Sequence, residues 1–240
     1  MELIHDTRQV SVRLRKDLTR SIKRGHAWLY SDAVELVPAD SGSIAILMDR
    51  KDERIACGIY DPEHPIPLRI CRTRPPLRLD DDWLSGQLSR AIKLRAAAFG
   101  ADTTGYRLVA GEGDGLPGLI IDRYHQTAVI KLDGGAPEAF YRPAGIAAWL
   151  QRELLIECVI LRSRDRGRAG EVLLGAEPAA PVEFLENGLR FTADVLQGQK
   201  TGFFLDQRDN RALVQSLSHG LRVLNLFSFN GGFSVAAGRG

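Results

Sequence analysis

The chain has 240 residues, which is enough for one large domain or two to three smaller ones. Hydrophobic residues make up 44% of it and charged residues 26%, which excludes disorder by composition and favours a packed core. No apolar run approaches the ~20 residues of a transmembrane helix, and the charged N-terminus lacks the apolar core of a signal peptide. We therefore predict a cytoplasmic protein that does not enter a membrane.

The three cysteines, Cys57, Cys71 and Cys158, lie far apart and form no CxxC pair. In a cytosolic protein this pattern favours buried, reduced thiols over disulfides. The five histidines share no ligand spacing with the cysteines. Because structural and catalytic metals need ligands at characteristic spacings, we predict no metal site.

The net charge is only +2, but basic residues gather in two segments, 1–24 and 69–78. A solvated protein face and a phosphate-contacting surface both fit such an excess, and charge alone does not separate them. Arginine and lysine gain affinity for nucleic acid by releasing its counterions. The candidate RNA-binding residues are Arg13, Arg15, Lys23, Arg24, Arg72, Arg74 and Arg78.

Residues 8–75 have the pattern of short strands with one helix, "DLTRSIKRG", which Gly25 closes. Turns rich in Asp, Gly and Pro separate the expected strands, which are 9–14, 33–37, 43–49, 54–61 and 65–72. Several strands of this length predict a small β-barrel or sandwich over residues 1–78.

Residues 79–192 are predicted to form a central α+β domain. A helix is expected over 83–99, where apolar residues recur at helical spacing, and a second helix around 139–154. Five strands are expected around these helices. The dipeptide Asn187-Gly188 between two apolar arms is a strong hairpin signal.

Residues 193–240 are predicted to begin an α/β domain of Rossmann-like type. Asp206 is a candidate helix N-cap, and the helix that follows would end at Gly220. "RVLNLFS" (222–228) is apolar on both faces, which predicts a buried parallel strand. "FNGGF" then turns into a final helix.

A strand, a glycine turn and a helix start present backbone N–H groups to an anionic ligand. Gly231 and Gly232 have no Cβ, so a ligand could approach closely, and Asn225 and Ser228 could donate hydrogen bonds. Plain turn chemistry is the alternative interpretation. The loop is not GxGxxG, which disfavours a nicotinamide enzyme.

Four motifs in order carry a resemblance to a known family: "RGHAWLYSDAVE" (24–35), "YRLVAGEGDGLPGLIIDRY" (106–124), "QGQKTGFFLDQRDNR" (197–211) and "VLNLFSFNGGFSVAA" (223–237). The chain resembles bacterial S-adenosylmethionine-dependent 23S rRNA methyltransferases that form 5-methylcytosine and carry an N-terminal PUA domain. The resemblance implies a PUA-like barrel, a central α+β domain and a Rossmann-like methyltransferase domain. It also implies S-adenosylmethionine as cofactor, ribosomal RNA (23S) as partner, and pairing into a homodimer.

Carried over by motif, the implied cofactor-binding residues are Asn225, Phe227, Ser228, Gly231, Gly232, Gln207 and Arg208. A complete family member continues further, to a ribose-binding acid and to the nucleophilic cysteine that C5 methylation requires. We therefore expect both beyond residue 240, no catalytic residue among those present, and a truncated chain that is itself inactive. The alternative hypothesis is a non-catalytic RNA-binding module made of the PUA-like and central domains.

Overall fold

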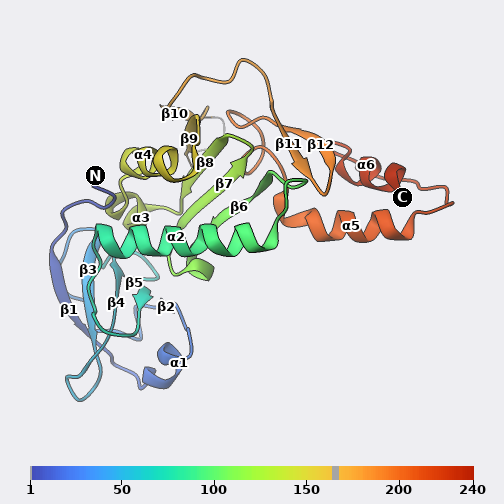
Figure 1. Ribbon diagram of the computed structural model, residues 1–240. Coiled ribbons are helices and arrows are strands. Elements are labelled where there is room, and N and C mark those ends of the chain that lie inside the picture. Colours follow the sequence, from blue (N-terminus) through green and yellow to red (C-terminus); the bar gives the residue numbers. More distant parts are fainter. Residues whose placement is uncertain (1, 164–167) are drawn as a thin grey trace.

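The first sheet is built from five short strands, in a computed structural model that describes residues 2–163 and 168–240 (Figure 1). Its strand order is β1-β3-β4-β5-β2; β1 and β3 are parallel and the other pairs antiparallel. The helix α1 (Thr19–Lys23) lies beside it. The strands are β1 (Gln9–Arg13), β2 (Trp28–Leu29), β3 (Ser43–Met48), β4 (Arg54–Tyr60) and β5 (Leu68–Arg72).

The expected strand at 33–37 is not a named strand, and that prediction is wrong. Val34 makes only an isolated bridge to Leu14. The sheet instead ends with the two-residue β2, which is not among the strands predicted from the sequence. Because β2 pairs with β5 through only Trp28 and Leu29, it is too short to leave a recognisable alternation.

The central sheet has the order β10-β9-β8-β7-β6, with β8 and β9 parallel and the other pairs antiparallel. The 3₁₀ turn η1 (Gly111–Asp114) follows β6. The strands are β6 (Gly105–Ala110), β7 (Leu119–Tyr124), β8 (Thr127–Leu132), β9 (Cys158–Arg162) and β10 (Glu171–Leu174).

The long helix α2 (Asp81–Ala98) lies alongside the central sheet, with the first sheet below it in the view of Figure 1. Asp80 caps this helix by accepting a hydrogen bond from the backbone N–H of Trp83. One expected helix around 139–154 is two in the structure, α3 (Gly135–Phe140) and α4 (Pro143–Leu154). Proline at the first position of α4 marks the break.

One hydrophobic core joins the two sheets. It combines Ile44 and Ile59 of the first sheet with Leu84 of α2 and Ile130 of β8. Close backbone approach supports this junction: a Cβ on Gly42, in the first sheet's region, would lie 2.7 Å from the Cβ of Ala139 on α3. The two sheets therefore pack as neighbours with a shared interior.

The hairpin of β11 (Val182–Glu186) and β12 (Leu189–Ala193) confirms the prediction made from its turn. Asn187 and Gly188 both have positive φ, 50° and 75°. This geometry is that of a two-residue type I′ turn, which Asn-Gly favours.

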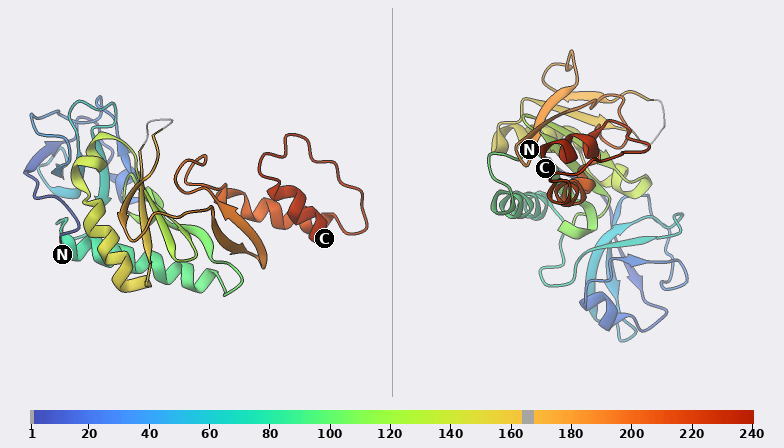
Figure 2. Two further views of the ribbon diagram at one scale, coloured as in Figure 1. Left: turned by 90° about the horizontal axis from the view of Figure 1, so that it is seen from above. Right: turned by 90° about the vertical axis from the view of Figure 1, so that its right-hand side faces the viewer.

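The C-terminal arm, residues 205–240, projects from the end of the molecule opposite the first sheet (Figure 2). It contains η2 (Leu205–Gln207), α5 (Arg208–Leu217) and α6 (Gly232–Arg239), and the two α-helices contact each other. No side chain caps α5, so the predicted N-cap role of Asp206 is wrong; its carboxylate instead accepts hydrogen bonds from the Lys200 ammonium.

The predicted buried strand at 222–228 is also wrong. This segment has no strand structure, and its apolar side chains are exposed, with Leu224 at 81%, Leu226 at 69% and Phe227 fully exposed. A strand needs a neighbour to satisfy its backbone N–H and C=O groups. None of the strands in the described part of the chain pairs with it.

Candidate functional site

The glycine loop of the C-terminal arm leads into the N-terminus of α6. Gly231 is the N-cap residue, in a left-handed conformation with φ of 73°, and a Cβ there would meet no atom within 4 Å. The backbone N–H of Gly232 donates to the Asn230 side chain, at 3.2 Å. The loop is therefore open, and a ligand could approach its backbone without displacing a neighbour.

Two of the predicted cofactor residues flank this helix start. The Asn225 amide donates a hydrogen bond to the Ser234 hydroxyl at 2.9 Å, and the Ser228 carbonyl accepts one from Gly231 at 2.8 Å. The Phe227 ring, in contrast, is fully exposed. The structure thus brings Asn225, Ser228 and the glycines into one loop, with Phe227 directed to solvent.

The preceding motif, residues 200–208, lies next to this loop through aromatic contacts. The Phe204 and Phe229 rings meet edge to face, with centroids 5.4 Å apart. Gly232 lies close to the Phe203 ring and to Arg211, each within 4 Å of where its Cβ would be. Two motifs separated along the chain therefore lie in one region of the structure.

Gln207 and Arg208 are held by neighbours at the start of α5. The Gln207 side chain accepts from Asn210 at 2.7 Å. The Arg208 guanidinium lies 4.5 Å from the centre of the Phe99 ring, at the end of α2, and pairs with Asp209. Arg208 is thus engaged by a stacking contact that the sequence analysis did not identify.

A buried hydrogen-bond network anchors the motif to the central sheet. The Thr201 hydroxyl donates to the Asp122 carboxylate at 2.6 Å, and Asp122 also accepts from the Arg107 guanidinium at 2.9 and 3.1 Å. The Tyr124 hydroxyl lies 2.9 Å from that of Thr201, and burial raises the pKa of Tyr124. Thr201 therefore has a positioning role, which the sequence could not reveal because Asp122 and Thr201 are 79 positions apart.

Lys200 and Asp206 form an ion pair on the surface of the same motif. The Lys200 ammonium hydrogen-bonds both carboxylate oxygens at 2.8 Å and lies 4.5 Å from the centre of the Phe204 ring. The hydrogen bond from Lys200 lowers the pKa of Asp206. This pair fixes the turn that precedes α5.

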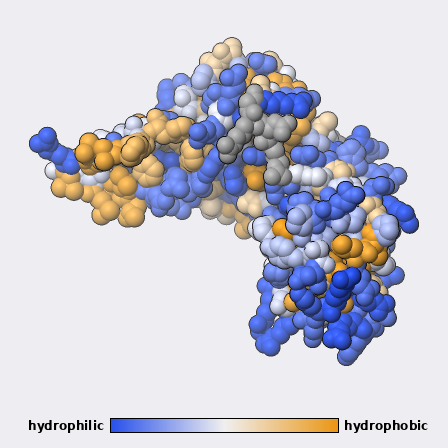
Figure 3. Space-filling model, turned by 180° about the vertical axis from the view of Figure 1, so that it is seen from behind, coloured by the Kyte–Doolittle hydropathy of each residue, from blue (hydrophilic) through white to orange (hydrophobic). Residues whose placement is uncertain are grey.

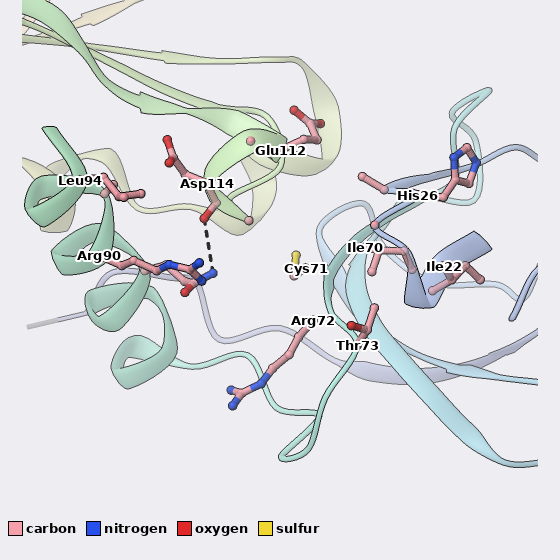
Figure 4. A pocket seen from close by; sticks show the side chains of 16 residues that line it. Ile22, His26, Ile70, Cys71, Arg72, Thr73, Arg90, Leu94, Glu112 and Asp114 are labelled. Carbon is pink, nitrogen blue, oxygen red and sulfur yellow. Dashed lines mark hydrogen bonds between the residues drawn. The ribbon is translucent and has the colours of Figure 1, made fainter. Parts of the chain in front are cut away.

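A second candidate site is a groove between the first sheet and α2. Two adjoining pockets, of about 390 Å³ and about 950 Å³, form it and share Arg72, Gln87 and Arg90. Figure 4 shows Arg72 extending from the strand of the first sheet and Arg90 from the facing helix. We call this feature the interdomain groove; its lining residues come from 22–27, 70–78, 80–94 and 112–115.

Only some of the seven predicted RNA-binding residues line the interdomain groove. Arg72, Arg74 and Arg78 line the interdomain groove. Arg13 instead pairs with Glu35 and Asp52. The residues outside the lining of the groove are Arg13, Arg15, Lys23 and Arg24.

The cysteines are all free thiols in the two sheets, where Cys57 and Cys158 are buried and Cys71 is half-buried. Desolvation raises the pKa of Cys57 to about 12 and that of Cys158 above its ordinary value. A raised pKa suppresses the thiolate that a nucleophile needs. Within residues 2–163 and 168–240, no cluster of metal-ligating side chains is found, and no helix is long and apolar enough to cross a membrane.

Two segments of the chain match known protein families. Residues 12–73 match the PUA-like domain family, and residues 141–240 match the family described as S-adenosylmethionine-dependent methyltransferase. The chain therefore combines a segment of the PUA-like domain family with a segment of the S-adenosylmethionine-dependent methyltransferase family, in the order that its resemblance predicts.

Curated relatives match nearly the whole chain. It is 43% identical to a ribosomal RNA large subunit methyltransferase of Deinococcus radiodurans, over 97% of this chain and 60% of the relative. It is 36% identical to ribosomal RNA large subunit methyltransferase I of Serratia proteamaculans, over 93% of this chain and 59% of the relative. The chain thus spans about three fifths of the length of these relatives.

Solved structures show the same fold. A protein of Streptococcus mutans, described as an S-adenosylmethionine-dependent methyltransferase, superposes with a TM-score of 0.78 at 23% identity, over 96% of this chain and 60% of that one. A methyltransferase structure complexed with S-adenosylhomocysteine superposes with a TM-score of 0.79 at 23% identity, over 97% of this chain and 60% of that one. These likenesses confirm the predicted α+β and methyltransferase-type architecture.

Proposed function

We propose that this protein binds S-adenosylmethionine at the glycine loop of the C-terminal arm and takes part in methylating large-subunit ribosomal RNA. The observation that carries the proposal is the convergence of residues 200–208 and 225–232 through the Phe204–Phe229 contact. The two curated relatives described above support the proposal, because each bears the name of a ribosomal RNA large subunit methyltransferase.

The residues present fit the methionine part of this cofactor. The eight-residue helix α6 directs its first backbone N–H groups toward the loop, where they and the helix dipole favour a carboxylate. The open space at Gly231 leaves room for a ligand against the backbone. Asn225, Ser228 and Gly232 would border it, with Phe227, Gln207 and Arg208 at its margin.

When bound, S-adenosylmethionine supplies an electrophilic methyl group. The finer proposal is that the product is 5-methylcytosine in 23S rRNA, made in the cytoplasm by a homodimer. Cytosine C5 becomes nucleophilic only after a thiolate adds to the ring. The raised pKa values and the burial of Cys57 and Cys158 make these thiols unsuitable for that step.

The second candidate function is an RNA-binding module without catalysis, made of the first two sheets. The exposure of the apolar side chains in 221–229 favours it, because an open loop binds a cofactor weakly when the surrounding domain does not hold it in shape. The two functions differ in whether the arm binds S-adenosylmethionine or its product.

Calorimetric titration with S-adenosylhomocysteine tests the proposal. We expect binding by the protein as it stands, and loss of binding in Gly231→Val, where a β-branched residue would be strained at φ of 73° and would fill the loop. Gly220→Val, at φ of 69° elsewhere in the arm, is the matched control. Equal binding by both variants would contradict the proposed cofactor site, and no binding by the unmodified chain would favour the RNA-binding module.

A further inference from the structure

The interdomain groove has walls from two different parts of the chain. Arg72 ends β5 of the first sheet, and Arg90 lies in the middle of α2, yet both line the same pockets. Figure 4 shows Arg90 reaching from α2 towards the space beside Cys71, and Arg72 extending from the end of β5 on the facing wall. A ligand in this groove would therefore contact both parts at once.

The acidic residues on the η1 wall already have partners. Glu112 accepts a hydrogen bond from the Trp28 indole at 2.8 Å and shares the buried Arg69 with Asp133, at 3.4 and 3.1 Å. Asp114 is held by a bidentate pair with Arg95, at 2.6 and 2.7 Å. These contacts also tie η1 to both the first sheet and α2, so this wall is preorganised.

Most of the basic side chains of the groove, by contrast, are not paired with an acid among residues 2–163 and 168–240. No ion pair of Arg72, Arg74 or Arg90 is found in the part of the chain that the structure describes, whereas Arg78 pairs with Asp80. The Arg72 guanidinium donates a hydrogen bond to the Arg74 carbonyl, at 3.1 Å, which leaves its charge unpaired. The exposed Asp82 at the far end of the groove is the acid that opposes this charge.

The smaller pocket also has apolar residues in part of its lining. Ile70 and Ala91 line it, and Leu94 is 53% exposed at its edge. An apolar shelf beside guanidinium groups suits an unstacked base next to its phosphate, because base faces are apolar and each phosphate carries one charge. A duplex would present stacked bases and no free face to this shelf.

We propose that the interdomain groove holds the sugar–phosphate backbone of a single-stranded RNA, with Arg72 and Arg90 contacting phosphates from opposite walls. This rests on the proposed function and deepens it by giving the RNA a binding surface that the PUA-like sheet does not form alone. It assigns a role to Arg90 and Gln87 of α2, and none to Arg13, which lies outside the groove and is paired with acids.

Fluorescence anisotropy with a single-stranded RNA of about 12 nucleotides, at several salt concentrations, tests this. The salt slope is the change in log K for RNA binding with log salt concentration. We expect Arg72→Gln and Arg90→Gln each to lower the magnitude of this slope by about 0.7 and to weaken binding about three- to fivefold. In the double variant the two reductions in slope should add. Arg72→Lys and Arg90→Lys retain the charge and should recover most of the affinity. Lys93→Gln makes the same charge change on α2 at a residue that does not line the groove, and Arg13→Gln does so on the first sheet; both should bind like the unmodified protein.

Each other result overturns a different statement. If the unmodified protein binds RNA and the two groove variants keep its slope, the groove is not the site, although RNA binding stands. If the unmodified protein binds no RNA, the ribosomal RNA substrate of the proposed function fails, and the groove with it. If duplex RNA binds as tightly, or inorganic phosphate competes at equal phosphate concentration, the site does not select a single strand.

Discussion

Strand β8 and the segment 222–228 are similarly apolar in sequence, but only β8 forms a buried strand. "TAVIKL" in β8 lies between β7 and β9, and Ala128, Val129 and Ile130 are completely buried. "RVLNLFS" is equally apolar, yet Leu224 and Leu226 are exposed and no strand forms there. The difference is the presence of partners on both sides.

Local sequence therefore sets only the capacity to form a buried strand. Burying apolar surface gains about 25 cal/mol per Å², and that gain needs a surface to pack against. β8 receives it from two neighbouring strands and from the core that α2 completes. The arm offers 222–228 only α5 and α6, and Figure 3 shows apolar side chains gathered on the surface of this arm.

The largest expected effect is in amide exchange. Amides of β8 and β9 should exchange only through global unfolding, whereas those of 222–228 should exchange several orders of magnitude faster, since no backbone ladder protects them. Hydrogen exchange with mass spectrometry, at two protein concentrations, measures both segments in one sample. Slow exchange of 222–228 that appears only at high concentration would show that a second copy supplies the missing neighbour; slow exchange at both would contradict the comparison.

A smaller contrast is expected in thiol reactivity. Desolvation raises the pKa of Cys57 from 9.0 to about 12, so at pH 8 it should carry about a thousandfold less thiolate than a free thiol. A cysteine placed in the exposed segment by Ser228→Cys is the comparison. Alkylation with iodoacetamide should label the introduced cysteine well before Cys57, and equal rates at the two sites would refute the burial of Cys57.

The raised pKa of Cys57 also predicts how the free energy of unfolding depends on pH. The neutral Cys57 thiol is favoured in the folded state, so its contribution is full below pH 9 and is lost as pH rises from 9 towards 12, where only the unfolded chain ionises. The denaturation midpoint of the unmodified protein should therefore fall between pH 8 and pH 10. The fall should be smaller in Cys57→Ala, which removes the titrating group.

A buried ion pair joins the arm to the hairpin. Arg211 of α5 donates to both oxygens of Glu186 in the hairpin, at 2.6 Å each, and the two side chains are 4% and 3% exposed. Removing one partner leaves a buried charge unpaired, so we expect Glu186→Gln to destabilise the docked arm by about 3 kcal/mol. Limited proteolysis and exchange in 203–217 would report the undocking.

A matched variant on the same helix sharpens this test. Arg208 also pairs with an acid, Asp209, but that acid is 86% exposed, so Arg208→Met should cost below about 1 kcal/mol. The double variant Glu186→Leu with Arg211→Met should recover part of the loss, because it leaves no unpaired charge. If residues 203–217 of the Glu186→Gln variant resist proteolysis and amide exchange as well as those of the unmodified protein, the ion pair does not hold the arm in place.

Features set by neighbouring residues were predictable from the sequence. The Asn187-Gly188 turn and the helix over 83–99 follow from local conformational preference and apolar spacing, and both are present, the helix as α2. The grouping of Asn225 and Ser228 with the glycines also follows from their closeness along the chain. The PUA-like and methyltransferase domain families were predicted from four ordered motifs, and the comparisons confirm these two families.

Features that need distant partners were not predictable. The role of Thr201 depends on Asp122, 79 positions away. Asp206 was mispredicted for a different reason: the nearby Lys200 offers its carboxylate a charge-assisted hydrogen bond that competes with helix capping. The contribution of α2 to the interdomain groove could not be predicted from the sequence, because the pattern around Arg90 is that of an ordinary solvent-exposed helix position. Among the predicted RNA-binding residues, charge could not distinguish the paired Arg13 from the uncompensated Arg72.

The smallest expected effect concerns the junction between the two compared regions. Thr201 gives its single hydroxyl proton to Asp122, so the Tyr124 hydroxyl donates in turn to Thr201. Thr201→Val keeps the shape but leaves a buried acceptor and a buried donor without this partner, which should cost about 1 to 3 kcal/mol. Thr201→Ser retains the hydroxyl and should lose far less.

Urea denaturation and exchange in residues 197–208 measure this change. If Thr201 positions the motif, Thr201→Val should raise exchange there and weaken S-adenosylhomocysteine binding, while β8 stays protected, because the Arg107–Asp122 pair remains. A uniform loss of protection across β8 and the motif would show instead that Thr201 belongs to the core of the central sheet. The boundary between the stable sheets and the arm would then lie beyond Thr201, nearer to α5.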